Sequence, residues 1–119
     1  MRYRIKEFKG SLIIKLEGKA REDEAARARR ALATFLRRPQ AKIILYLAGL
    51  REIGISELGV FDAIRREVKA NGGSLRLCGL RDDLRTGFDR NPFLQVYELY
   101  RDLESSLSGI LELPLKRSA

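Results

Sequence analysis

The order of strand and helix patterns along the 119 residues predicts a single α/β domain with a mixed sheet. Two β-patterned segments meet at a tight turn near residue 10, which predicts an N-terminal antiparallel hairpin. Two later apolar strand patterns each follow a helical pattern, which predicts parallel βα units. A chain of this length buries only one core, so we expect one domain over 1–108. From the pattern along the chain we expect it to hold four to five strands and about four helices. The tail, 109–119, either docks on this domain or frays.

The hairpin comes first. Its first strand is expected over 3–8, its turn over 9–11 and its second strand over 12–17, with Gly18 closing that strand. A helix is then predicted over Arg21–Arg38, since acidic residues fill its first turn and basic residues its last turn. Its apolar stripe comprises Ala25, Ala28, Leu32, Phe35 and Leu36.

The next unit begins with a strand over Lys42–Leu47, whose unbroken apolar run predicts burial on both faces. A helix should follow over Ser56–Asn71, ended by two glycines, and then a strand over Ser74–Cys78. The buried side of that helix should comprise Leu58, Phe61, Ala63, Ile64 and Val68. After Gly79 we expect a helix over Arg81–Asp89, an edge strand over Phe93–Tyr97 and a last helix over Asp102–Ser108.

Residue types that carry most enzyme chemistry are absent. The chain has no histidine, which removes the commonest general base and zinc ligand, and it has no cysteine cluster or glycine-rich phosphate loop. We therefore expect a protein that is not an enzyme and has no cofactor or metal. The single Cys78 forms no internal disulfide, and no signal peptide or membrane-spanning run occurs, so a cytoplasmic location is the default.

The positive charge is concentrated in the first third of the chain. Residues 1–38 hold twelve Lys and Arg against five Asp and Glu, whereas 39–119 hold twelve against eleven. This asymmetry favours an anionic partner for the basic face, although a solvated helix face would also explain it. Nucleic acid is disfavoured, because no helix-turn-helix and no strand of interleaved aromatic and basic residues occurs.

Four segments resemble one known family. These are Leu16-Glu17-Gly18 after the second strand, Leu45-Tyr46-Leu47-Ala48-Gly49-Leu50 on the third strand, the glycine turn and strand over 71–79, and Ile-Gly-Ile-Ser-Glu-Leu-Gly over 53–59. The last is similar to the Ile-Asp-Ser-Ser-Gly-Leu-Gly switch motif of STAS domains, the modules of sulphate transporters and bacterial anti-sigma factor antagonists. With the order of elements, the resemblance extends to about Gly109 and implies a STAS-like fold.

The resemblance implies a bacterial regulator of sigma factors and transcription that works by binding. In such antagonists the switch serine is phosphorylated by an anti-sigma factor that is also a kinase, and the unphosphorylated form binds that partner. Ser56 lines up with the switch serine, so it is the expected phosphorylation site. The residues alone leave two interpretations open, because a serine at this joint either caps the helix or also acts as a switch.

The sequence departs from the family pattern at acidic positions. Gly54 stands where the family has an acid before its two serines, and Ile55 takes the place of the first serine. Tyr46 takes the place of the acid on the third strand, and Lys19 and Arg21 lie nearest to the acidic position after the second strand. Glu57 replaces a glycine. We expect its carboxylate to disfavour a phosphate on the preceding serine by repulsion and to suit the first turn of its own helix.

We expect a partner-binding surface centred on Ser56. Its residues are Lys19, Arg21, Gly54, Ile55, Ser56, Glu57 and Leu58. Because its rim is basic, the expected partner is an anti-sigma factor or kinase-like protein with an acidic docking patch. The alternatives are a phosphorylation-independent adaptor, as in a lipid-transport ATPase, and a small-ligand or nucleotide sensor that receives an anion near Arg21. The oligomeric state stays open, a homodimer included.

Overall fold

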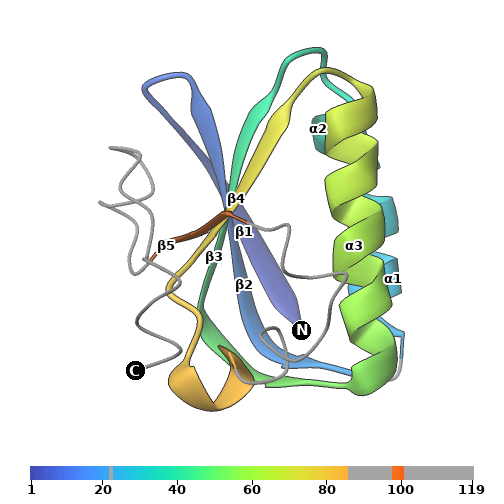
Figure 1. Ribbon diagram of the computed structural model, residues 1–119, viewed down its shortest axis with the longest axis vertical. Coiled ribbons are helices and arrows are strands. Elements are labelled where there is room, and N and C mark those ends of the chain that lie inside the picture. The colour runs from blue at the N-terminus through green and yellow to red at the C-terminus, as the bar shows by residue number, and fades with distance from the viewer. Residues whose placement is uncertain (22, 86–97, 101–119) are drawn as a thin grey trace.

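Five strands form one mixed sheet in the computed structural model, in the order β1-β2-β3-β4-β5 (Figure 1). The structure describes residues 1–21, 23–85 and 98–100. The strands are β1 (Arg2–Phe8), β2 (Ser11–Ala20), β3 (Lys42–Ile53), β4 (Ser74–Cys78) and β5 (Glu98–Tyr100). β1 pairs with β2 antiparallel, and the other neighbours pair parallel. The predicted fold class, an α/β domain with an N-terminal hairpin, is confirmed.

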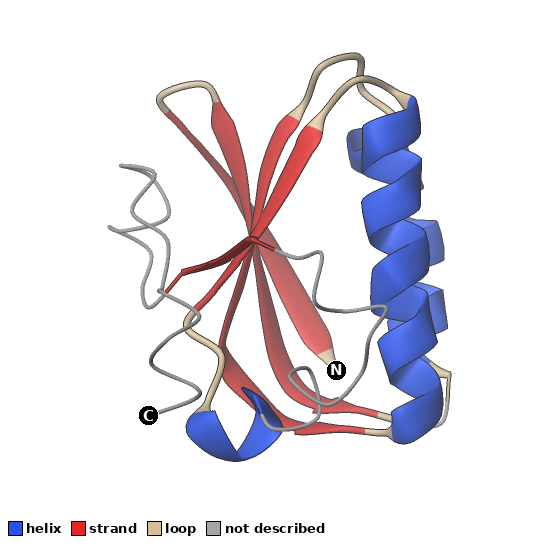
Figure 2. Cartoon of the chain, in the orientation of Figure 1, coloured by secondary structure: helices blue, strands red, loops and turns tan. Residues whose placement is uncertain are grey.

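Three helices lie along one face of the sheet, as Figure 2 shows. They are α1 (Glu24–Ala31), α2 (Ala33–Leu36) and α3 (Ile55–Ala70). A helical turn at 82–85 agrees with the start of the helix predicted after Gly79, and the rest of that helix lies outside the described residues. The predicted strand over Phe93–Tyr97, the helix over Asp102–Ser108 and the tail also lie outside them.

β2 and β3 supply much of the core. Their helix-facing residues pack with Phe61 and Leu36 from the helices, whereas Ile13 and Ile44 face the other way and form a second cluster with Cys78. Both strands are therefore buried on both faces, as the unbroken apolar run of β3 predicted.

The end of β2 corrects one prediction. Gly18 does not close the strand, because β2 continues to Ala20 alongside β3, which itself runs on to Ile53. Gly18 has φ +100°, and the pairing with β3 shifts on either side of it. The glycine thus accommodates an irregularity of the ladder instead of ending it.

The helix predicted over Arg21–Arg38 is also corrected. It begins at Glu24 and is divided at Leu32, where φ is −92° and ψ is 0°. The Leu32 carbonyl then accepts a tighter bond from the N–H of Phe35, at 2.9 Å. The division leaves both Leu32 and Leu36 buried against the sheet, so tertiary packing overrides the continuous helical pattern.

Two turns match their sequence signals. Lys9 and Gly10 both have positive φ, as a two-residue hairpin turn of the primed kind requires. At the end of α3, Gly72 has φ +75°, and the N–H of Gly73 donates to the carbonyl of Val68 at 3.0 Å. This is a Schellman motif, which explains the paired glycines.

Candidate functional site

Ser56 lies where β3 passes into α3, at the carboxyl ends of the parallel strands β2 and β3. It is the second residue of α3, and the N-cap is Gly54, with φ −69° and ψ 152°. The carbonyl of Gly54 accepts the first bond of the helix, from the N–H of Glu57 at 3.0 Å. The interpretation of Ser56 as the helix cap is therefore wrong, because the helix starts before it.

Gly54 ties the two loops of this site together. Its N–H donates to the carbonyl of Ala20 at 2.8 Å, so the start of α3 is fastened to the end of β2. A Cβ at Gly54 would lie 3.5 Å from its nearest neighbour, the Cγ of Glu57, which is ordinary contact. Space therefore does not impose glycine where the family usually has an acid.

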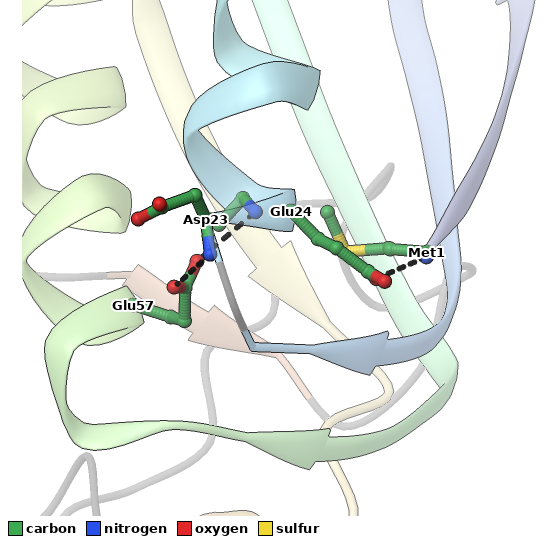
Figure 3. Close-up of polar contacts among 5 residues, drawn as sticks. Met1, Asp23, Glu24 and Glu57 are labelled. Atoms are coloured by element: carbon green, nitrogen blue, oxygen red, sulfur yellow. Dashed lines mark hydrogen bonds and ion pairs between the residues drawn. The ribbon is translucent and has the colours of Figure 1, made fainter.

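Glu57 points into the protein, toward the start of α1 (Figure 3). Its side chain is only 2% exposed. Oε1 accepts the N–H of Asp23 at 3.1 Å, and Oε2 accepts the N–H of Ala25 at 3.0 Å. These contacts correct two expectations. The carboxylate stabilises the first turn of α1 instead of the first turn of its own helix, and it is buried instead of lying on the partner-binding surface.

The start of α1 needs this borrowed carboxylate. Its N-cap, Asp23, has φ +65° and makes no side-chain cap bond. The first N–H groups of a helix lack partners within it and carry the positive end of the helix dipole. Glu57 supplies both acceptors and a negative charge, so the first turns of α1 and α3 are held as one unit.

A second contact anchors the same turn of α1. The carboxylate of Glu24 receives a hydrogen bond from the amino group of Met1 (Figure 3). This bond, helped by the charge of the amine and of nearby arginines, lowers the pKa of Glu24. The beginnings of β1 and α1 are therefore joined by an ion pair.

The basic rim of the site is partly neutralised. The side chains of Lys19 and Arg21 both approach the carboxylate of Glu52, at 4.0 Å and 3.5 Å. In the β2–β3 ladder Lys19 stands directly beside Glu52. We did not single out Glu52 from the sequence, because its place in the rim depends on β2 continuing beyond Gly18.

Gly59, in the second turn of α3, lies outside the surface predicted from the sequence. Gly59 is exposed, and a Cβ there would meet nothing within 4 Å. Leu58 beside it is half-buried against the core. Gly59 ends the segment over 53–59 that resembles the family motif, and a glycine inside a predicted helix is the sequence signal that could have identified this position.

Tyr46 does not join this site. It packs with Ile13, Ile44 and Cys78 on the sheet face away from the helices, and the ammonium of Lys15 lies 5.5 Å from its ring centre. Of the positions where the family is acidic, the structure brings together Gly54, Lys19 and Arg21, near Ala20, and leaves Tyr46 apart.

The described part of the chain offers little for metal chemistry or membrane insertion. Within residues 1–21, 23–85 and 98–100 there is no group of three or more side chains suited to holding a metal ion. In the same ranges no helix has the length and apolar character to cross a membrane.

The chain belongs to the STAS domain family, because residues 2–106 match the sequence model of that domain. No curated protein matches the sequence. Solved structures share its fold at low identity. An anti-sigma factor antagonist (STAS) domain protein from Planctomyces limnophilus has a TM-score of 0.78 at 15% identity, covering 91% of this chain and 97% of its own.

Two further proteins widen the comparison. The anti-sigma factor antagonist SpoIIAA in its unphosphorylated form has a TM-score of 0.71 at 17% identity, covering 93% of this chain and all of its own. The murine anion transporter Slc26a9 has a TM-score of 0.77 at 9% identity, covering 88% of this chain but only 18% of its own. The fold thus occurs both in small antagonists and within a transporter.

Proposed function

We propose that this chain is a non-catalytic interaction module that acts as an anti-sigma factor antagonist. It would bind an anti-sigma factor or kinase-like partner through the Ser56 surface, which we define as Lys19, Arg21, Gly54, Ile55, Ser56, Leu58 and Gly59. Support comes from the family and from the likeness to antagonists of similar size. SpoIIAA has also been solved in a phosphorylated form, at 17% identity to this chain.

Gly59 is the observation that carries the proposal. Glycine inside a helix costs about 0.5–1 kcal/mol relative to alanine. Nothing in the surrounding fold requires it, since a Cβ there would stand in open space. Because Gly59 has no side chain, another protein could approach the helix backbone closely there, one turn after Ser56. The glycine therefore favours an interface at the start of α3.

The charges of the rim favour an acidic partner. Lys19 and Arg21 contribute two positive charges, of which Glu52 offsets one, and Glu57 is turned inward. Rim charges chiefly steer association and are screened by salt. Binding should therefore weaken as ionic strength rises, and an affinity that stays constant between low and high salt would remove this part of the proposal.

The position of Ser56 suits a phosphorylation switch. The first turn of a helix favours negative charge through its dipole and free N–H groups. The carboxylate of the next residue, Glu57, already accepts two backbone N–H groups at the start of α1. A phosphate of about −1.5 to −2 charges on Ser56 would repel an acidic docking patch on the partner. Phosphorylation would thus release the partner without unfolding the domain.

The test uses a candidate anti-sigma factor with a serine-kinase fold, cloned from the same genome, with binding measured by calorimetry. Gly59→Ala should raise the free energy of unfolding by about 0.5–1 kcal/mol yet weaken binding. Gly59→Lys should weaken binding further. Lys69→Ala, at the exposed far end of α3, is the matched control and should leave binding intact. Binding that is unchanged in both Gly59 variants contradicts the proposal.

Phosphorylation is tested separately, by incubation with that kinase and ATP followed by mass spectrometry. We expect modification at Ser56, none in Ser56→Ala, and loss of binding in the modified form. If the partner binds while Ser56 stays unmodified throughout, the protein is instead a phosphorylation-independent adaptor.

A further inference from the structure

β1 is the outermost strand on one side of the sheet among the described residues. It pairs with β2 on one side and has no strand on its other side within the described parts of the chain. All of its residues are exposed except Ile5, which is half-buried. Such an edge presents a row of backbone N–H and C=O groups that can pair with another extended chain. None of the residues of β1 belongs to the Ser56 surface.

The two faces of β1 differ in chemistry. Ile5 packs against the helix-side core, and its partner in β2 is Ile14. Because side chains alternate, Tyr3 and Glu7 lie on that same face. Arg2, Arg4, Lys6 and Phe8 lie on the opposite face, all exposed, and the guanidinium of Arg4 also pairs with the carboxylate of Glu17 in β2, at 3.2 Å. An added strand would thus meet a basic row on one face and a mainly apolar row on the other.

A cavity lies beside the apolar row. It has a volume of about 340 Å³ and is lined by Met1, Tyr3, Glu24, Arg27, Ala28 and Ala31, between β1 and α1. Tyr3 is 42% exposed, so much of its ring is open to solvent. Apolar side chains of an added strand would cover Tyr3 and enter this space.

A second copy of this chain is a poor occupant of the edge. If two β1 strands paired antiparallel about Ile5, Arg4 of each would stand opposite Lys6 of the other. If they paired about Arg4, the two Arg4 side chains would face each other and Arg2 would face Lys6. Like charges directly opposite on a sheet are destabilising, and edge lysines and arginines commonly prevent self-pairing.

We propose that β1 receives an extended acidic segment of another protein, which adds to the sheet as an antiparallel strand. Acidic residues at alternate positions of this segment lie opposite Arg2, Arg4 and Lys6. The apolar residues between them lie against Tyr3 and Ile5 and reach the cavity under α1. Main-chain hydrogen bonds supply affinity, and the alternation of acidic and apolar residues supplies specificity.

The probe is a capped, fluorescent peptide of sequence Glu-Val-Glu-Leu-Glu-Val-Glu, and binding is followed by anisotropy. A second peptide has the same composition with the four glutamates clustered at one end. We expect only the alternating peptide to shift the β1 amides in two-dimensional NMR spectra and to slow their hydrogen exchange. Equal binding of both peptides, or shifts that avoid β1, would overturn the proposal.

Charge reversal locates the contact. The double variant Arg4→Glu, Lys6→Glu should bind the alternating peptide about tenfold more weakly, because two exposed pairs become repulsions. It should instead bind a peptide with lysines in place of the glutamates. The control double variant, Arg30→Glu with Lys69→Glu, makes the same change of net charge at exposed helix positions and should change affinity less than twofold. An equal loss of affinity in the control would mean that only general electrostatic attraction holds the peptide, and it would contradict the proposal.

Sedimentation of the unliganded protein tests whether a second copy of this chain occupies the edge. A dimer that the β1 double variant abolishes would identify a second copy on this edge and overturn the proposal. None of these variants touches the Ser56 surface, so the result is independent of anti-sigma factor binding.

Discussion

Replacing Glu57 with alanine should be among the most damaging single changes to a polar side chain in the described parts of this protein. The carboxylate is 2% exposed and accepts two backbone N–H groups of α1, at 3.1 Å and 3.0 Å. Alanine leaves both donors without an acceptor at the start of a helix. The consequence should be loss of the junction between α1 and α3, not only of one contact.

The magnitude follows from the burial of each donor. A hydrogen bond to a charged group contributes about 1.5–3 kcal/mol, and an unsatisfied buried donor costs about 1–3 kcal/mol. The N–H of Ala25 is at a buried contact and should lose about 2–3 kcal/mol, whereas that of Asp23 is only partly buried and recovers water, so it should lose about 1 kcal/mol. We expect Glu57→Ala to lower the free energy of unfolding by about 3–4 kcal/mol, a large part of the roughly 5–15 kcal/mol typical of a domain.

Glu57→Gln separates charge from shape. Glutamine keeps one acceptor oxygen but turns an NH₂ group toward the other N–H, so it should cost about 1–2 kcal/mol. The control is Glu52→Gln, which changes an exposed carboxylate with partners at 3.5 Å and 4.0 Å and should cost under about 1 kcal/mol.

Urea unfolding followed by circular dichroism measures these differences, and hydrogen exchange reports the amide of Ala25 directly. The expected order of stability is wild type, then Glu57→Gln, then Glu57→Ala, with faster exchange at Ala25 in the alanine variant. If both Glu57 variants lie within about 1 kcal/mol of wild type, α1 does not depend on the borrowed cap, and our account of this junction is wrong.

Three further changes test other parts of the site and its frame. Gly54→Ser should stabilise the protein by up to about 1 kcal/mol in thermal unfolding, because serine is a good N-cap and restricts the unfolded chain; a lower melting temperature would contradict this. Gly73→Ala should cost about 1–3 kcal/mol, since its Cβ would stand 2.5 Å from the carbonyl oxygen of Ala41, and a neutral result in urea would refute the steric argument. The lowered pKa of Glu24 means that its ion pair with Met1 stabilises the fold above the ordinary carboxyl range and stops doing so as pH falls through the lowered pKa. The stability difference between wild type and Glu24→Gln should therefore shrink below about pH 4, and acetylation of the amino terminus should reduce this pH dependence to the part that comes from the arginines.

Features set by neighbouring residues could be predicted from the sequence. The hairpin turn at Lys9 and Gly10 requires positive φ at both positions, and the glycine pair after α3 closes a Schellman motif. The unbroken apolar run of β3 indicated burial on both faces, and the structure confirms it. These signals depend on backbone preferences and on periodicity over a few residues, so they survive without knowledge of the fold.

The sequence by itself determined the order of elements, the α/β class and the place of Ser56 at the joint between β3 and α3. Only the tertiary structure decided what surrounds that joint. Glu57 bonds to N–H groups 32 and 34 residues earlier in the chain, and Glu52 reaches the rim because β2 runs past Gly18. Hydrogen bonds and ion pairs form wherever packing brings donors and acceptors together. The spacing of these residues along the sequence does not predict which of them will come into contact.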